Sequence, residues 1–320
     1  MAMRVVANLE RNPSIDGLKF MAAALIVLFH VSGVVAVTGS TTGSFVSGAS
    51  YWALSLFFCV AGYFHGPLGT RGGSWLYRRA LRLGVPYAAW SAFYLAFRIA
   101  RGAPLPSWWR IVFLGGAEDV LWSLPLLLAC AALAELFVST ALRRRLFGTT
   151  FLIAAIAGVA AASSSQSELG ALTPLLVWPF VYAVGMEIRS LSRPIAAPVL
   201  LATAVGSILA LGTLPALAVS GVSSDVARLV LNTAAAAAVL TGAHLNQRWT
   251  AAKALAPGGP YLLGVYVLHV FWQHMAGHVV RLGEIGASTY ILVTWITVLG
   301  LSVLSTRVLR SSRFTRWAVD

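Results

Sequence analysis

The chain has 320 residues, of which 58% are hydrophobic and only 10% are charged, and its mean hydropathy is +0.81. A soluble domain of this length carries about 25% charged residues, so the composition excludes an ordinary water-soluble protein and predicts an integral membrane protein. The net charge of +13 does not indicate nucleic-acid binding. The basic residues lie in short clusters between apolar runs, as in cytoplasmic loops that face the anionic lipids of a bilayer.

Ten apolar segments come close to the length of about 20 residues that a helix needs to cross a bilayer. The predicted spans, in chain order, are 18–37, 50–66, 84–100, 121–141, 147–163, 172–188, 197–217, 228–244, 261–280 and 288–307. The residues before the first span are too polar for a signal peptide, so this span is expected to stay in the membrane. The fold class is therefore an all-α bundle of about ten transmembrane helices, and residues 1–320 form a single integral membrane domain.

Loop charge predicts the orientation of these spans. If the N-terminus is inside, the arginine clusters at 78–82, 143–145 and 307–316 all fall in cytoplasmic segments, whereas acidic residues such as Glu118 fall outside. Cytoplasmic loops carry an excess of Lys and Arg. We therefore expect both termini in the cytoplasm and a multi-pass protein of the inner (plasma) membrane.

Ionisable side chains inside the first span are the most informative feature, because such groups are costly in a membrane unless they are paired or face a wet cavity. His30 lies 11 residues after Lys19, and 11 residues of helix return almost to the same face. Asp16 lies one turn before Lys19 on this stripe. The pattern predicts His30 as a general base or nucleophile in a cavity, with Lys19 holding an anionic ligand. The alternative is a packing histidine, with Lys19 reaching toward the interface.

Two arginines precede the predicted third span. Arg79 and Arg82 are three residues apart and share a face if they are helical, and Pro86 would fall in the first turns of the span. A helix N-terminus with two guanidinium groups is a good phosphate site. The alternative is that both arginines anchor the helix on the cytoplasmic side.

The ninth span contains three histidines, His269, His274 and His278. The last two are four residues apart, but no Cys, Asp or Glu accompanies them at ligand spacing, so no metal site is predicted. Trp122, at the outer end of the predicted span 121–141, fits either the aromatic belt of a membrane protein or the lining of a pocket.

Four segments in order resemble the motifs of the membrane acyltransferase 3 family. They are the acidic, basic and histidine pattern of 14–30, the Phe-Phe-x-x-Ser-Gly-Tyr/Phe motif at 57–63, the double-arginine motif of 79–86 and the Tyr-x-x-His segment of 266–269. Two positions depart from the family. Lys19 replaces the usual arginine, which keeps the charge but loses the bidentate fork, and Ala61 replaces a serine.

The resemblance implies an O-acyltransferase that moves an acyl group, commonly acetyl, from cytoplasmic acyl-CoA to a hydroxyl of a glycan, a lipid-linked sugar or a glycosylated small molecule. No bound cofactor is implied, and the partners are these two substrates and the lipid bilayer. The implied roles are catalytic for His30 and Asp16 (which would orient Lys19 or a nearby arginine), donor binding for Lys19, Arg79 and Arg82, and pocket lining for Tyr63, Trp122, Tyr266 and His269.

The residues by themselves leave other function classes open. A transporter or flippase for a glycolipid or small solute would use the same cavity without chemistry, and an inactive scaffold would keep the fold alone. An enzyme consumes acyl-CoA and depends on His30, which separates it from both alternatives.

Overall fold

The computed structural model describes residues 12–65, 72–118, 120–137, 148–156, 173–191, 195–214, 222–245, 250–279 and 285–319. These residues form helices and turns without any strand among them, which confirms the predicted all-α class. The helices are α1 (Pro13–Ala36), α2 (Thr41–Ser50), α3 (Trp52–His65), α4 (Gly72–Ala100), α5 (Trp108–Leu114), α6 (Ser123–Phe137), α8 (Thr173–Arg189), α9 (Ala197–Thr213), α10 (Val222–Leu245), α11 (Thr250–Ala254), α12 (Leu262–Val279) and α14 (Ala287–Ser311), with 3-10 helices η2 (Ala256–Tyr261) and η3 (Arg316–Ala318). Residues 148–156 are also helical.

Each of the ten predicted spans overlaps one of these helices. Four helical stretches of the described residues are long and apolar enough to cross a membrane, namely Pro13–Ala36, Thr41–His65, Val226–Leu245 and Ala287–Ser311. The chain is therefore a helical membrane protein. The number of ten spans and the cytoplasmic position of both termini stay predictions. Residues 138–141 and 157–163 of the predicted spans, and the arginine cluster at 143–145, lie outside the described residues.

Two predicted boundaries are wrong. The predicted second span starts at 50, but α2 already occupies the segment before it, where the Ser40 side chain caps the helix by accepting a hydrogen bond from the Gly43 N–H. The predicted third span starts at 84, but α4 begins at Gly72. Arginine and leucine are good helix formers, so the helix continues from the apolar segment through the basic one. Pro86 therefore lies inside α4 and not in its first turns.

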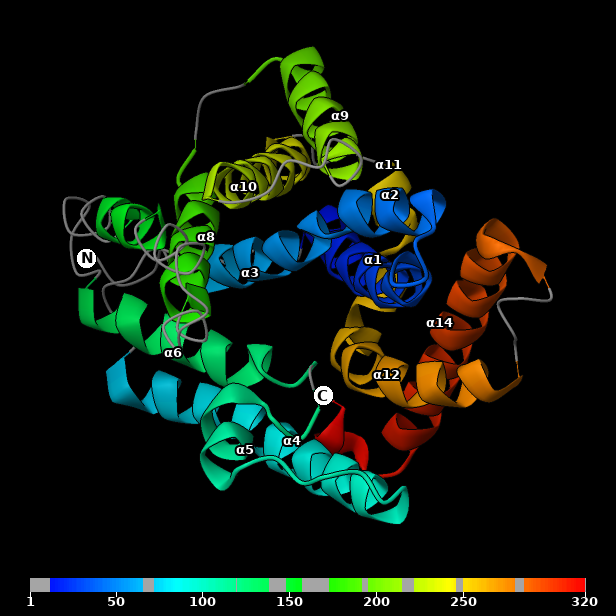
Figure 1. The fold of residues 1–320 in the computed structure, drawn as a ribbon. Coiled ribbons are helices and arrows are strands. Elements are labelled where there is room, and N and C mark those ends of the chain that lie inside the picture. Colours follow the sequence, from blue (N-terminus) through cyan, green and yellow to red (C-terminus); the bar gives the residue numbers. More distant parts are fainter. Residues whose placement is uncertain are drawn as a thin grey trace.

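Helix α1 lies in the middle of the bundle (Figure 1). It starts at a cap in which the Asn12 side chain accepts from the Ser14 N–H, and Pro13 occupies the first turn, where its missing N–H costs nothing. In the view of Figure 1, α9 and α10 lie at the top, α4 and α5 at the bottom, α6 and α8 on the left and α14 on the right. Helix α1 packs against α2, α3, α10, α12 and α14.

Helices α3 and α8 approach each other closely through two glycines. A Cβ atom on Gly62 would collide with the carbonyl group of Tyr182, and a Cβ atom on Gly185 would collide with the carbonyl group of Cys59. Small residues at such contacts let the backbones of membrane helices pack tightly. Gly62 is the glycine of the aromatic motif in 57–63, so this motif residue has a packing role.

Candidate functional site

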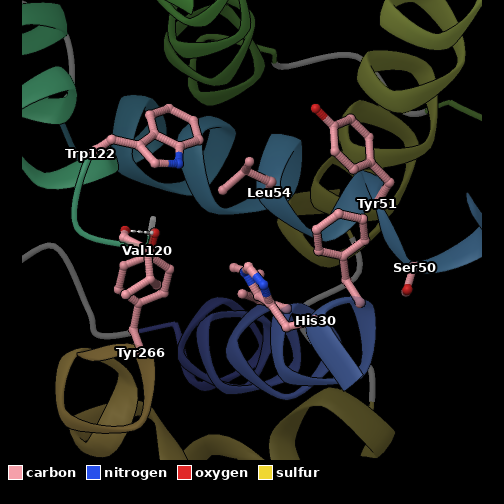
Figure 2. Close-up of a pocket in the computed structure, with 9 residues that line it drawn as sticks. His30, Ser50, Tyr51, Leu54, Val120, Trp122 and Tyr266 are labelled. Carbon is pink, nitrogen blue, oxygen red and sulfur yellow. Dashed lines mark hydrogen bonds between the residues drawn. The ribbon is translucent and has the colours of Figure 1, made fainter. Parts of the chain in front are cut away.

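A cavity of about 210 Å³ lies between α1, α3, α12 and the turn that precedes α6 (Figure 2). His30 of α1 stands on its wall, about five turns into the helix. The rest of the wall is mainly aromatic and aliphatic. The lining residues are Ile26, Phe29, His30, Ser50, Tyr51, Leu54, Val120, Trp122 and Tyr266.

A second imidazole lies beside His30. The ring centres of His30 and His269 are 5.0 Å apart, with the ring planes at 46°. His269 is fully buried in α12, and its Nδ1–H donates to the carbonyl oxygen of Tyr266 at 2.7 Å. A carbonyl can only accept, so the neutral ring carries its lone pair on Nε2. This Nε2 is buried without a hydrogen-bond partner among the described residues.

The backbone beside His30 is also held from α12. The side-chain amide of Gln273 donates to the carbonyl oxygen of His30 at 3.1 Å. This bond links α1 to α12 one turn beyond His269. The two helices therefore keep a fixed register at the level of the two histidines.

Tyr266 builds the cavity wall opposite α3. Its hydroxyl donates to the carbonyl oxygen of Val120 at 2.7 Å and accepts from the hydroxyl of Ser123 at 2.7 Å. Its ring stacks on Phe57 of α3, with the ring centres 5.3 Å apart. These contacts hold the turn before α6 against α12, and in Figure 2 the indole nitrogen of Trp122 is turned toward the cavity. Of the four predicted pocket residues, Trp122 and Tyr266 thus line this cavity.

The other two predicted pocket residues lie elsewhere. His269 stands next to His30 but is not among the residues that line the cavity. Tyr63 lies near the end of α3, where its hydroxyl hydrogen-bonds Nδ1 of His244 at 3.0 Å and its carbonyl oxygen accepts from Arg189 at 3.0 Å. Tyr63 therefore links α3, α8 and α10 at that end of α3.

Lys19 and Asp16 form an ion pair on α1, with 2.8 Å between Nζ and Oδ1. The ammonium group also lies 3.8 Å from the centre of the Phe64 ring. The Asp16 side chain is almost completely buried, whereas that of Lys19 keeps 23% of its surface exposed. Lys19 is therefore held in one orientation at the end of α3, three turns of α1 below His30.

The two arginines do not lie at a helix N-terminus, so this part of the prediction is wrong, and their binding of phosphate stays a prediction. Both lie inside α4, two to three turns after Gly72. The guanidinium group of Arg79 lies over the Trp75 ring, 5.2 Å from its centre, and Trp75 meets the ring of His65 edge-on. The Nε atom of Arg79 is buried without a hydrogen-bond partner in the described part of the chain, whereas Arg82 is exposed.

Lys19 and Arg79 thus lie on either side of the end of α3. Lys19 contacts Phe64, and Arg79 reaches the next residue, His65, through Trp75. Lys19 on α1 and Arg79 on α4, both predicted to bind the donor, therefore lie near the same end of α3.

His65, near the end of the predicted span 50–66, was not among the candidate site residues, and it is fully buried. Its Nδ1 hydrogen-bonds the hydroxyl of Tyr182, and its Nε2 lies 3.4 Å from Oε1 of Glu135. A glutamate inside an apolar span signals a partner, but the sequence does not show which one.

Histidines and acidic groups do not gather into a metal site in the described ranges, where no three His, Cys, Asp or Glu side chains lie close enough to hold an ion. The side chain of His278 lies outside the described residues. The absence of a metal stays a prediction.

A comparison with protein families matches residues 12–306 to the acyltransferase 3 model, described as an acyltransferase domain. The match includes every candidate site residue from Asp16 to His269. No curated protein and no solved structure matches the chain. The family match supports acyl transfer and leaves the transporter alternative without support.

Proposed function

The chain belongs to the membrane acyltransferase 3 family, and we propose that it is an O-acyltransferase that moves an acyl group from acyl-CoA to an acceptor hydroxyl. The observation that carries this proposal is His30, an ionisable side chain on the wall of an aromatic cavity inside the bundle. A membrane-embedded ionisable group is a functional candidate by default.

The chemistry assigned to His30 is proton transfer. Its lone pair takes the proton of the acceptor hydroxyl while the acceptor oxygen attacks the thioester carbonyl. The new C–O bond forms, the C–S bond breaks, and the leaving thiolate takes the proton from the imidazolium to give free CoA. A transient acyl-imidazole on His30 would divide the same transfer into two steps.

The donor would enter from the end of the bundle where Lys19 and Arg79 lie. Lys19 and His30 are separated by 11 residues of α1, or roughly 16 Å at 1.5 Å per residue. Coenzyme A has a long arm between its phosphates and its thioester, so its phosphates can bind the cations while the thioester reaches His30. Asp16 orients Lys19 through their ion pair, and the exposed Arg82 adds charge on α4.

The cavity suits a small cyclic acceptor and a short acyl group. A cavity of roughly 150 Å³ holds one benzene molecule, so about 210 Å³ has room for one six-membered ring with substituents. The aromatic side chains of Phe29, Tyr51 and Trp122 can stack on the apolar faces of a sugar ring. This supports acetyl as the acyl group and a glycan, a lipid-linked sugar or a glycosylated small molecule as the acceptor.

The test uses purified protein in lipid nanodiscs and measures CoA released from acetyl-CoA and longer acyl-CoAs, with and without sugar acceptors. His30→Ala should lower the rate by about 10² to 10⁴, the usual contribution of a general base. His274→Ala is the matched control, since it removes a histidine of α12 outside the cavity lining, and should keep the wild-type rate.

Donor binding is measured separately by titration with CoA. Lys19→Ala and Arg82→Ala should weaken CoA binding, whereas His30→Ala should not. CoA release that survives His30→Ala would refute the role of His30. Wild-type protein that is folded but neither binds CoA nor releases it would refute the enzyme and favour a transporter.

A further inference from the structure

His269 has one ring nitrogen that is fully committed and one that is not. Its Nδ1–H is bonded to the backbone of Tyr266, which leaves Nε2 as a pure acceptor. That atom has no partner among the described residues and is shielded from solvent. An unpaired buried acceptor is destabilising, so a helix bundle keeps one at a cost unless the atom has a partner during function.

The group best placed to become that partner is the ring of His30. Two imidazoles with centres 5.0 Å apart can bring a nitrogen of each within hydrogen-bond distance after a small rotation of one ring. The backbones need not move, because Gln273 already fixes the carbonyl of His30 to α12. His30 is also one of the residues that line the cavity.

We propose that His269 is a positioning residue for His30: its Nε2 accepts the N–H of the His30 nitrogen that is turned away from the cavity. The inference rests on the proposed function of His30. With one nitrogen of His30 held as the donor to His269, the other must carry the lone pair, and that lone pair faces the acceptor hydroxyl. His269 therefore selects the tautomer of His30 that can act as a base.

The proton path is simple in this arrangement. The acceptor proton moves to the cavity-facing nitrogen of His30 as the C–O bond forms, and it leaves on the thiolate when the C–S bond breaks. The N–H toward His269 stays in place throughout, and His269 stays neutral. The lone pair of His269 stabilises the transient imidazolium of His30. The residue that orients the base in a catalytic triad does the same in other acyl transfers.

At the position of His269, a neutral hydrogen-bond acceptor suits the membrane interior better than a carboxylate. An aspartate in the same place would add a buried charge within the membrane-spanning part of the chain, which is costly. The imidazole of His269 has no net charge, and its tautomer is set by a backbone carbonyl of its own helix. A backbone carbonyl of α12 thus fixes the orientation of the His269 lone pair.

The first test uses His269→Ala in nanodiscs and the assay of CoA release. We expect kcat to fall about 100-fold while the KM for acyl-CoA stays near the wild-type value. Added imidazole should restore at least a tenth of the lost rate. Pyrrole, which has the same ring shape but no acceptor nitrogen, should not restore it.

Three results would overturn the proposal. They are an unchanged kcat in His269→Ala, equal rescue by imidazole and pyrrole, and imidazole rescue of the double variant His30→Ala with His269→Ala. The second result would show that the ring only fills space. The third would show that imidazole acts as the base without His30.

A second test needs no substrate, so it separates this inference from the proposed function. The protein has six histidines, and solid-state NMR of ¹⁵N-histidine in lipid bilayers reports the tautomer of each ring, with His30→Ala giving the assignment. His30 should occupy one tautomer in the wild type and a mixture in His269→Met. One unchanged tautomer in both proteins would refute the hydrogen bond. If the proposed function fails instead, CoA release is absent in every protein while the NMR difference remains.

Discussion

The hydroxyl of Tyr266 offers a direct test of how the cavity wall is held. The group donates to the Val120 carbonyl and accepts from Ser123, both at 2.7 Å. Tyr266→Phe removes both hydrogen bonds but keeps the ring that stacks on Phe57. The perturbation therefore acts on polar contacts and leaves the volume of the core almost unchanged.

The expected magnitude follows from what the substitution leaves behind. A buried carbonyl without its donor costs about 1–3 kcal/mol in a soluble protein, but hydrogen bonds between membrane helices average only about 0.6 kcal/mol, because helices that separate within the bilayer find other partners. Two bonds are lost here, so we expect Tyr266→Phe to lower the free energy of unfolding by about 1–2 kcal/mol. This is roughly a tenfold change in the unfolding equilibrium constant.

The assay is an equilibrium unfolding titration with SDS in mixed micelles, followed by the fluorescence of the 11 tryptophans. Ser123→Ala should cost less than Tyr266→Phe, because Tyr266 can still donate to Val120. The double variant should be destabilised by about 0.6 kcal/mol less than the sum of the two single effects. Tyr266→Phe alone leaves the Ser123 hydroxyl without the oxygen to which it donates, and the double variant no longer has this hydroxyl.

A Tyr266→Phe protein that unfolds at the wild-type SDS concentration would refute this reasoning. Strict additivity of the two substitutions would also refute it, because it would mean that the two hydroxyls do not interact in the folded protein.

Two further predictions concern glycines. Gly185→Ala should destabilise the fold by about 1–3 kcal/mol through overpacking against the Cys59 carbonyl. The control is Gly206→Ala on α9, where a Cβ meets nothing, which should stabilise the fold by up to about 1 kcal/mol. Similar midpoints of SDS unfolding for the two variants would contradict the close contact of α3 with α8. Gly115 has a φ of +64° and no room for a Cβ beside the backbone of Trp122, so Gly115→Ala should raise the KM for the acceptor. Gly102→Ala, at φ +66° in open space, keeps the backbone strain without the clash, and an equal KM in both variants would show that this contact does not shape the cavity.

The apolar runs were sufficient to predict a helical membrane protein, because backbone groups inside a bilayer must find their hydrogen bonds within a helix. The predicted first span at 18–37 ends within one residue of α1 at Pro13–Ala36, although the helix begins five residues earlier. The stripe of Asp16, Lys19 and His30 was equally readable, since residues on one helix are placed by the helical repeat alone.

Helix ends were less readable where the chain leaves the apolar segment. The basic residues before 84 marked a loop by charge, yet they are good helix formers, and α4 runs through them. The small polar residues of 41–50 likewise form α2. A hydropathy pattern predicts which residues lie within the bilayer, but it does not predict where a helix ends.

Only the tertiary structure decided which residues meet. Three contacts join helices that are far apart in the sequence: His30 with His269, His65 with Glu135, and α3 with α8 through Gly62. A soluble helix shows its buried face as an apolar stripe. Here the lipid-facing and the buried faces are both apolar, so the sequence pattern carries almost no information about which side of a helix packs inward, and the partners of the site appear only when the helices are assembled.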